Sequence, residues 1–187
     1  MNDDLVKAKE ILLKGGVICY PTDTIWGLGC DACNAEAVSK IYAIKKRSDN
    51  KSMLILLDHE YRLDQYVKEV PDIVRQLIEV NDSPMTIIYD GAKNLASNLI
   101  ASDGSIGIRI TSDPFCKRLI ELIRRPLVST SANISGTPAP RYFKEINEEI
   151  LNLADYVVKW RQDDNTPAKA SSILRTGYNG EINILRK

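Results

Sequence analysis

The sequence predicts a single α/β domain over residues 1–187, in which helices flank a twisted, mixed β-sheet. Three observations support this fold class. The chain has 187 residues, of which 44% are hydrophobic, and this is enough for one sizeable core. Short apolar runs alternate with amphipathic stretches, as strands and helices do in α/β domains. The chain closes with two strand-like runs around Asn179-Gly180, which favours an antiparallel hairpin and therefore a mixed sheet.

Helical periodicity occurs in stretches that have recognisable start or stop residues. We expect helices over about residues 4–14, 35–47, 59–68, 71–80, 114–124 and 142–153. The first has Asp3 as a candidate N-cap and stops at Gly15 and Gly16. Asn34 is a good N-cap for the second, whose apolar residues share one face and which ends in three cations at residues 45–47.

Short apolar or alternating runs predict the strands. They cover about residues 17–20, 53–57, 85–89, 105–111, 126–130, 155–159, 171–175 and 181–186. In the run 105–111, isoleucines alternate with Gly107 and Arg109, so we expect Arg109 on the face opposite the isoleucines. Residues 94–103 give a mixed signal, which we interpret as a short helix and a turn.

Three polar stretches lie near strand ends, where ligands bind in sheets of this kind. The turn at residues 22–24 carries two hydroxyls and a carboxylate, and Gly27 and Gly29 follow it, where the backbone can approach a ligand closely. The other two stretches are the basic segment 45–51 and the hydroxyl-rich loop 129–133. These three stretches are therefore the candidates for a shared site.

The side chains in these stretches suit a phosphorylated ligand. Lys45 offers a point charge and Arg47 a planar fork, while Ser131 and Asn133 add neutral donors, so together they can hold a triphosphate. Arg109 can hold a carboxylate through two hydrogen bonds. Plainer interpretations remain open. Lys45 and Arg47 also fit a solvated helix end, and Arg109 fits an exposed ion pair. Ser131 and Asn133 also fit ordinary turn chemistry.

Composition and missing motifs exclude several classes of function. Equal numbers of basic and acidic residues, 25 of each, argue against a general nucleic-acid coat or a membrane-surface protein. No run approaches the roughly 20 apolar residues that span a bilayer, and the start MNDD does not resemble a secretory signal. We therefore expect a cytoplasmic protein that does not enter a membrane. The chain has neither a P-loop motif nor a strand-GxGxxG-helix motif.

Metal and triad chemistry are not expected either. Cys30 and Cys33 form a CxxC pair that no second pair follows, and His59 is the only histidine. A structural zinc site usually takes four protein ligands, and a Ser-His-Asp triad would depend entirely on His59. We predict no metal site built by the protein, and we expect reduced cysteines.

Four segments carry a resemblance to a known family: PTDTIWGLG, IYAIKKR, SIGIRI and STSANISG. In this order and spacing they resemble the YrdC-like family of threonylcarbamoyl-AMP synthases, in its short single-domain bacterial form. The resemblance implies a YrdC-like fold with a large concave ligand groove. It also implies ATP-dependent synthesis of L-threonylcarbamoyl-AMP from L-threonine and bicarbonate, with release of pyrophosphate and with magnesium carried by the ATP. The product would pass to a tRNA-modifying threonylcarbamoyl transferase complex, which attaches the group to an adenosine beside the anticodon.

The resemblance assigns roles to individual residues. The family's catalytic Lys-x-Arg and Ser-x-Asn tetrad corresponds to Lys45, Arg47, Ser131 and Asn133. Its ATP contacts correspond to Arg47, Lys51, Ser105, Ser131 and Arg186. Its threonine pocket corresponds to Thr24, Arg109, Ser129 and Ser171. The segments 48–52 and 136–140 would be lids that close over the reactants.

Two other functions fit the same residues. The basic segments 45–51 and 117–125 could bind double-stranded RNA or tRNA directly, in a module without chemistry of its own. The neutral net charge and the aromatic content of 6% oppose this interpretation. The chain could also be a carbamoyl-adenylate enzyme with a different acceptor, as related domains in hydrogenase maturation are. Those domains normally sit in longer chains with acylphosphatase and zinc-finger modules, which are not visible in this sequence.

Overall fold

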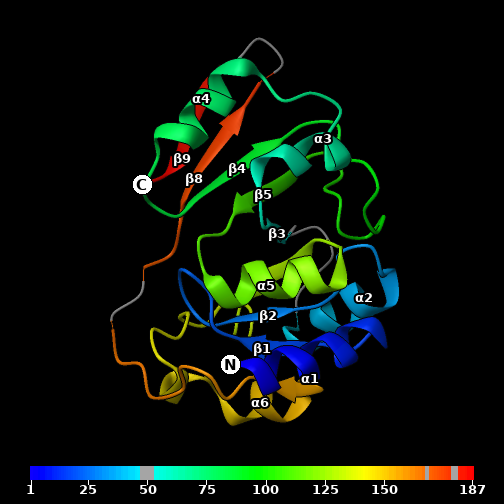
Figure 1. Cartoon of the computed structure of the whole chain (residues 1–187), viewed down its shortest axis with the longest axis vertical. Helices are drawn as coiled ribbons and strands as arrows, with labels where there is room; N and C mark the ends of the chain where they lie inside the picture. The colour runs from blue at the N-terminus through cyan, green and yellow to red at the C-terminus, as the bar shows by residue number, and fades with distance from the viewer. Residues whose placement is uncertain (47–52, 167–168, 178–180) are drawn as a thin grey trace.

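The computed structural model describes residues 1–46, 53–166, 169–177 and 181–187. The strands of these residues form one mixed sheet in the order β7-β1-β2-β6-β3-β5-β4-β8-β9 (Figure 1). Their bounds are Ile18–Tyr20 (β1), Gly27–Gly29 (β2), Leu54–Leu57 (β3), Met85–Tyr89 (β4), Ile106–Ile110 (β5), Leu127–Ser131 (β6), Tyr156–Val157 (β7), Ser172–Thr176 (β8) and Ile182–Arg186 (β9). The neighbours β1/β7, β3/β5 and β4/β8 are parallel, and the other neighbours are antiparallel. The predicted α/β class with a mixed sheet is confirmed.

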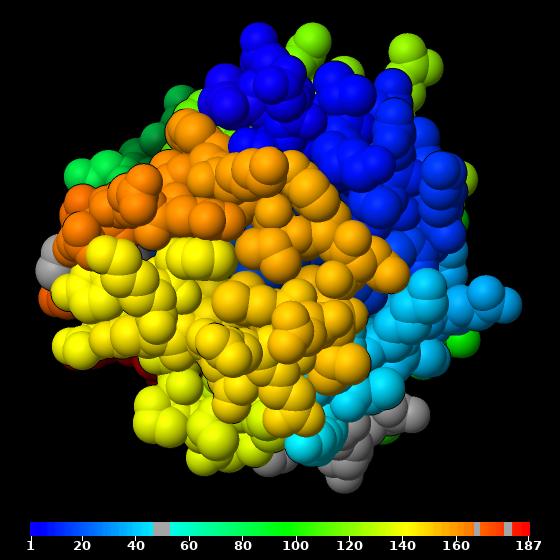
Figure 2. Space-filling view, turned by 90° about the horizontal axis from the view of Figure 1, so that it is seen from below, coloured from blue at the N-terminus to red at the C-terminus, as the bar shows by residue number. Residues whose placement is uncertain are grey.

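Helices cover both faces of this sheet. Their bounds are Asn2–Leu13 (α1), Ala35–Ile44 (α2), Leu63–Tyr66 (α3), Asp72–Val80 (α4), Pro114–Ile123 (α5) and Glu148–Leu153 (α6), with 3-10 turns at Glu60–Arg62 (η1) and Phe143–Glu145 (η2). α1 and α5 lie side by side in front of β1 and β2 (Figure 1) and share one hydrophobic cluster with β1 and β3. α2 and α4 contribute to a second, larger cluster. Figure 2 shows the segment with η2, α6 and β7, coloured yellow to orange, covering one end of the molecule beside α1.

The alternation in β5 sets which side chains lie on each face of the sheet. Arg109 pairs in register with Leu56 of β3 and with Thr86 of β4, so these three side chains share one face. Ile106 and Ile108 belong to the larger hydrophobic cluster on the opposite face, at 1% and 2% exposure. The predicted orientation of Arg109, away from the isoleucines, is confirmed.

Local capping chemistry explains several helix boundaries. The Asn34 side chain accepts a hydrogen bond from the backbone N–H of Ala37 at 3.1 Å, as predicted, and opens α2. Gly15, at φ +73°, follows the end of α1 because glycine adopts the left-handed region without a steric cost. The prediction that Asp3 caps this helix is wrong. Met1 is the N-cap, and Asp3 lies in the first turn, where its charge suits the helix dipole.

Other boundaries differ from the sequence prediction. β2 was not predicted as a strand, because two of its three residues are glycines. A Cβ atom at Gly29 would lie 2.6 Å from Tyr20 Cε1 and 2.7 Å from the Val128 carbonyl oxygen, so close packing against neighbouring strands requires glycine there.

The helix predicted over 59–68 is η1 followed by α3, and the one over 142–153 is η2 followed by α6. The short helix predicted within 94–103 is wrong, because this segment forms only bends, turns and irregular backbone. The predicted hairpin turn at residues 179–180 lies outside the described residues.

None of the helices in the described part of the chain is both long enough and apolar enough to cross a membrane.

Candidate active site

A cavity of about 290 Å³ lies on the Arg109 face of the sheet. Its walls come from the turn after β1, from β2, β3, β5 and β6, and from the C-terminal strands. Six of the predicted site residues line it: Thr24, Arg109, Ser129, Ser131, Ser171 and Arg186. The chain therefore brings together residues that lie more than 160 positions apart in the sequence, from Thr24 to Arg186.

The turn at residues 22–24 is held by its own hydroxyls. Thr22 Oγ1 accepts a hydrogen bond from the backbone N–H of Thr24 at 3.0 Å and donates to the Ile25 carbonyl oxygen at 2.8 Å. The two threonine hydroxyl oxygens are 3.0 Å apart. Thr24 is thus fixed at the cavity wall, where the residue is 7% exposed.

Arg109 enters the cavity from β5 and is buried, at 3% exposure. Its Nη2 lies 3.0 Å from Oδ1 of Asp23, which is also buried. The interpretation of Arg109 as an exposed ion pair is therefore wrong, because both partners are shielded from water. Within the described residues, Nε and Nη2 of Arg109 and Oδ1 of Asp23 have no hydrogen-bond partner, since the contact lacks hydrogen-bond geometry. The guanidinium has a counter-charge and retains unsatisfied donors.

Lys45 is the other buried cation near the cavity, and its amine faces the loop 131–133. Its Nζ donates to the carbonyl oxygen of Ser131, to the carbonyl oxygen of Asn133 at 2.7 Å and to Asn133 Oδ1 at 3.3 Å. Lys45 is only 1% exposed, so the interpretation as a solvated helix end is wrong for this residue. The Ser131 hydroxyl also donates to Asn133 Oδ1. Three of the four predicted tetrad residues are therefore in contact.

Asn133 continues this network into the following loop. Its Nδ2 donates to the Thr137 carbonyl oxygen at 2.6 Å, and the backbone N–H of Ser135 donates to the Lys45 carbonyl oxygen at 2.9 Å. The start of the predicted lid at residues 136–140 is thus anchored to Lys45 and Asn133. Arg47, Lys51 and the predicted lid at 48–52 lie outside the described residues.

The C-terminal strands supply the opposite wall. The hydroxyl oxygens of Ser171 and Thr86 are 2.7 Å apart, and both side chains are buried. Arg186 donates from Nε and Nη2 to the Ser171 carbonyl oxygen at 3.0 and 2.6 Å. The guanidinium of Arg186 therefore fixes the backbone that presents the Ser171 hydroxyl.

Ser105 does not line the cavity that the described residues form. Its hydroxyl donates to Asp103 Oδ1 at 2.6 Å, and Arg175 donates to the other carboxylate oxygen at 2.9 Å. The hydrogen bonds from Ser105 and then from Arg175 lower the pKa of Asp103 to about 2. Ser105 lies just before β5, whereas Arg109 lies near the end of that strand.

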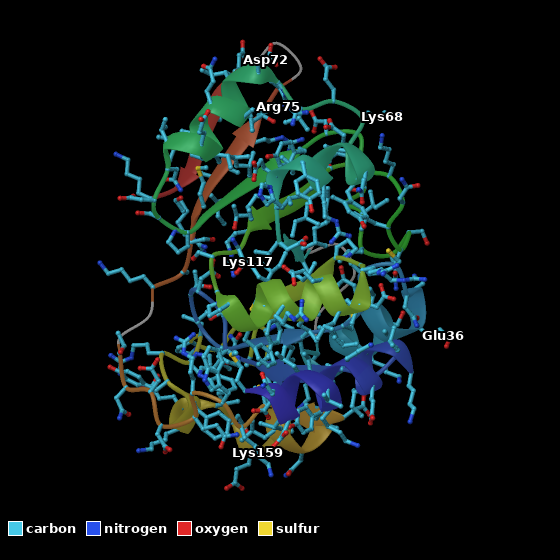
Figure 3. All side chains as sticks on the ribbon, in the orientation of Figure 1. Glu36, Lys68, Asp72, Arg75, Lys117 and Lys159 are labelled. Carbon is cyan, nitrogen blue, oxygen red and sulfur yellow. The ribbon has the colours of Figure 1, made fainter. Side chains whose placement is uncertain are left out.

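A second, larger cavity of about 780 Å³ is lined by Ile87 and Ile108, on the opposite face of β4 and β5 from Arg109, and also by Asp23. α4 and α5 contribute Arg75 and Lys117 to its wall, and Figure 3 labels both side chains. Nη2 of Arg75 donates to both carboxylate oxygens of Asp64, at 2.8 and 2.9 Å. This cavity contains none of the predicted site residues.

The chain matches one protein family over nearly its whole length. The sequence model of Sua5/YciO/YrdC, described as telomere recombination, matches residues 10–187. The chain belongs to this family. It is 32% identical over 187 residues to a protein named threonylcarbamoyl-AMP synthase from Pseudoalteromonas translucida (strain TAC 125), covering 97% of this chain and 98% of that relative. The family predicted from the sequence is confirmed.

Solved structures of the family share the fold. E. coli YciO matches with a TM-score of 0.86 at 24% identity, over all of this chain and 90% of that one. P. abyssi Sua5, in a structure described as complexed with L-threonine, matches with a TM-score of 0.81 at 22% identity, over 91% of this chain and 50% of that one. These likenesses establish the YrdC-like fold.

Sequence reasoning missed two residues that contact the cavity wall: Asp23 beside Arg109 and Thr86 beside Ser171. Asp23 stood in a turn that was already singled out, but no role was assigned to it. Thr86 gave no signal, because a threonine within an apolar strand is common in any sheet. No group of three or more histidine, cysteine or acidic side chains in the described part of the chain is arranged to hold a metal ion.

Proposed function

We propose that this chain makes L-threonylcarbamoyl-AMP from L-threonine, bicarbonate and ATP, with release of pyrophosphate. The observation that carries the proposal is the 290 Å³ cavity, in which the buried guanidinium of Arg109 faces three hydroxyl-bearing residues. Those three are the residues that the resemblance assigns to threonine: Thr24, Ser129 and Ser171. The name of the Pseudoalteromonas relative supports the same activity.

The threonine end of the cavity suits an α-amino acid that has a hydroxyl. Arg109 retains donors without hydrogen-bond partners within the described residues, and a ligand carboxylate can accept two hydrogen bonds from such a fork. The hydroxyls of Thr24, Ser129 and Ser171 can exchange hydrogen bonds with the ligand amine and side-chain hydroxyl. Charge at this end is balanced by Asp23, so recognition depends on directed hydrogen bonds.

The reaction needs no protein nucleophile. The threonine amine condenses with bicarbonate to give a carbamate and water, and a carbamate oxygen then attacks the α-phosphorus of ATP. The bond between the α-phosphorus and the oxygen of the pyrophosphate leaving group breaks, and threonylcarbamoyl-AMP and pyrophosphate remain. Catalysis then consists of positioning and charge neutralisation, which suits a chain with one histidine.

We assign the phosphate side to the tetrad and its neighbours. Arg47 and Lys51, with magnesium that arrives on the ATP, would neutralise the phosphates. Lys45 has its amine on the carbonyl oxygens of Ser131 and Asn133, so its role is to hold the loop that presents the Ser131 hydroxyl. Arg186 similarly holds Ser171. Ser105 does not line the described cavity, so it could contact ATP only if the nucleotide extends beyond this cavity.

The product would serve a threonylcarbamoyl transferase complex that modifies tRNA. The RNA-binding alternative gains no support from the second basic segment, since Arg118 pairs with Glu121 at 2.8 Å and Arg125 lies 3.5 Å from Asp31. Direct binding of tRNA remains an outcome of the test below.

The test is pyrophosphate release from ATP and magnesium by the purified chain, with and without L-threonine and bicarbonate, together with mass spectrometry of the nucleotide product. We expect release only when both are present, and a product with the mass of threonylcarbamoyl-AMP. An Arg118→Ala variant, changed on an exposed helix face, is the matched control and should keep full activity. Absence of release from the folded protein, with steeply salt-dependent RNA binding, would contradict the proposal.

A further inference from the structure

Asp23, the ion-pair partner of Arg109, has no assigned role. It lies on the turn between Thr22 and Thr24, and its carboxylate is 5% exposed. Within the described residues it is the ion-pair partner of Arg109, at 3.0 Å. Arg109 lines the 290 Å³ cavity and Asp23 lines the 780 Å³ cavity, so the ion pair stands between the two.

The carboxylate of Asp23 is itself held in place. Its Oδ2 accepts a hydrogen bond from the backbone N–H of Ser112 at 3.3 Å, just beyond the end of β5. The turn that carries it is fixed by the Thr22 hydroxyl and by Arg161, which donates to the Thr22 carbonyl oxygen at 3.3 Å. Both the carboxylate of Asp23 and the turn that carries it are therefore held by hydrogen bonds.

The other polar groups around Arg109 do not replace Asp23. Burial raises the pKa of the Tyr20 phenol and of the Cys116 thiol well above their usual values, so both are neutral. Asp113 is buried close by, but it pairs with Arg161 at 2.9 Å and caps α5 through the Cys116 N–H. Among the described residues, Asp23 is thus the anion that compensates the buried guanidinium.

We infer that Asp23 is the positioning residue that holds the Arg109 guanidinium in the orientation that receives the substrate carboxylate, and this role rests on the proposed function. Its contact compensates the charge without taking up the Nε and Nη2 donors, which have no hydrogen-bond partner in the described part of the chain. A carboxylate that enters the cavity can therefore use donors that are already placed. Burial of an uncompensated guanidinium would be costly, so without Asp23 this side chain would turn toward water.

Two possible roles of Asp23, reducing the attraction for anions and positioning Arg109, predict opposite changes in threonine affinity for Asp23→Asn. This substitution keeps the shape and removes the negative charge, so the cavity becomes more cationic. If Asp23 only reduced the attraction for anions, the variant would bind threonine more tightly. If Asp23 positions Arg109, threonine affinity falls despite the added positive charge. We expect the dissociation constant for L-threonine, measured by calorimetry, to rise about tenfold or more, while the KM for ATP changes less than twofold.

A second readout separates positioning from a general loss of structure. Threoninamide lacks the carboxylate, so the wild-type chain should bind it much more weakly than threonine. In Asp23→Asn this preference should shrink about tenfold. Asp113→Asn is the matched control, because it neutralises a carboxylate of the same cluster, and asparagine still caps α5. The control should lose stability but keep the preference and the affinity for threonine.

The outcomes distinguish this inference from the proposed function. A wild-type chain that neither binds threonine nor releases pyrophosphate in its presence would defeat the proposed function. A wild-type chain that does both, with unchanged or tighter threonine binding in Asp23→Asn, would defeat the inference alone. If Asp23→Asn does not fold, Asp23→Glu decides, because it keeps the charge and shifts the carboxylate by one methylene. Unchanged threonine affinity in a folded Asp23→Glu variant would overturn the positioning role.

Discussion

Within the described residues, the two buried cations at the cavity, Lys45 and Arg109, make different contacts. The amine of Lys45 donates to neutral oxygens of the loop 131–133, which come from the protein itself. Arg109 has a carboxylate at 3.0 Å, and within the described residues its Nε and Nη2 still lack hydrogen-bond partners. A cation whose donors are satisfied by backbone oxygens mainly stabilises a loop, whereas one with unsatisfied donors is available to a ligand.

The strongest test of this difference is Arg109→Ala. The variant should weaken threonine binding by about 1.5 to 3 kcal/mol, the usual range for a hydrogen bond to a charged group, which is roughly 10- to 150-fold. Calorimetric titration with L-threonine measures it. Equal affinity in the variant and the wild type would mean that the unsatisfied donors of Arg109 do not serve this ligand.

The next test is Lys45→Ala, for which we expect a loss of stability as well as of turnover. Removing the amine leaves buried oxygens of Ser131 and Asn133 without their donor, which costs about 1–3 kcal/mol in the free energy of unfolding. Urea denaturation measures this cost. A solvated lysine at a helix end would contribute little stability, whereas Lys45 is buried.

The neighbouring lysine is the control. Lys46 is exposed and pairs with Glu149 at 2.8 Å, so Lys46→Ala should change the free energy of unfolding by less than about 1 kcal/mol. If the two lysine variants lose equal stability, the amine of Lys45 does not hold the loop.

A smaller effect is expected where two neutral hydroxyls meet at the cavity wall. Thr86→Val removes the partner of the Ser171 hydroxyl and should cost about 1 kcal/mol of stability, with a few-fold loss of threonine affinity. Thr176→Val is the matched control, since Thr176 is buried in the same sheet and its hydroxyl donates to the Ile88 carbonyl oxygen instead of to a residue of the cavity wall. It should lose stability alone. Threonine affinity that falls equally in both variants would argue against a local role for Thr86.

The smallest effect concerns a buried anion, Asp4, whose hydrogen bonds come from neutral groups. Asp4 accepts hydrogen bonds from the Tyr156 hydroxyl at 2.6 Å and from the backbone N–H groups of Lys159 and Trp160 at 2.9 and 3.1 Å. Burial tends to raise its pKa, but these bonds outweigh burial and lower the pKa below 3.8. The stabilisation is therefore present above pH 3.8 and is lost as the pH falls through the lower folded-state value. The difference in free energy of unfolding between the wild type and Asp4→Asn, measured by urea denaturation, should shrink as the pH falls from 3.8 through the folded-state pKa. A difference that does not change with pH would contradict this role of Asp4.

Sequence reasoning predicted most of the fold because its signals were local. The alternation around Arg109, the cap at Asn34 and the apolar strands depend on neighbouring residues, and all were confirmed. β2 was missed because its glycines resemble a turn. Gly29 is required by close packing against Tyr20 of β1 and the Val128 carbonyl oxygen of β6, and no local pattern shows these contacts. The turns of 94–103 carried residues compatible with a helix, and no local signal separated the two.

The candidate site was predicted less completely than the fold. The resemblance supplied the residues that line the cavity, but it could not supply their partners. The buried state of Lys45, the Asp23 contact of Arg109 and the Thr86 contact of Ser171 all depend on strand order and register. These contacts decide whether a cation supports the loop or meets a ligand. The resemblance could name the site residues, but only the structure could show what each one contacts.

The edge strand β9 is connected to one wall of the cavity. β9 is exposed along its whole length and, among the described strands, pairs only with β8. Yet Arg186 at its end donates two hydrogen bonds to the carbonyl oxygen of Ser171 in the cavity wall. One wall of the cavity is thus attached to the strand that is least protected from solvent. Backbone amides of β9 should exchange with deuterium before those of β3 and β6, and a bound ligand that packs against Arg186 should slow that exchange.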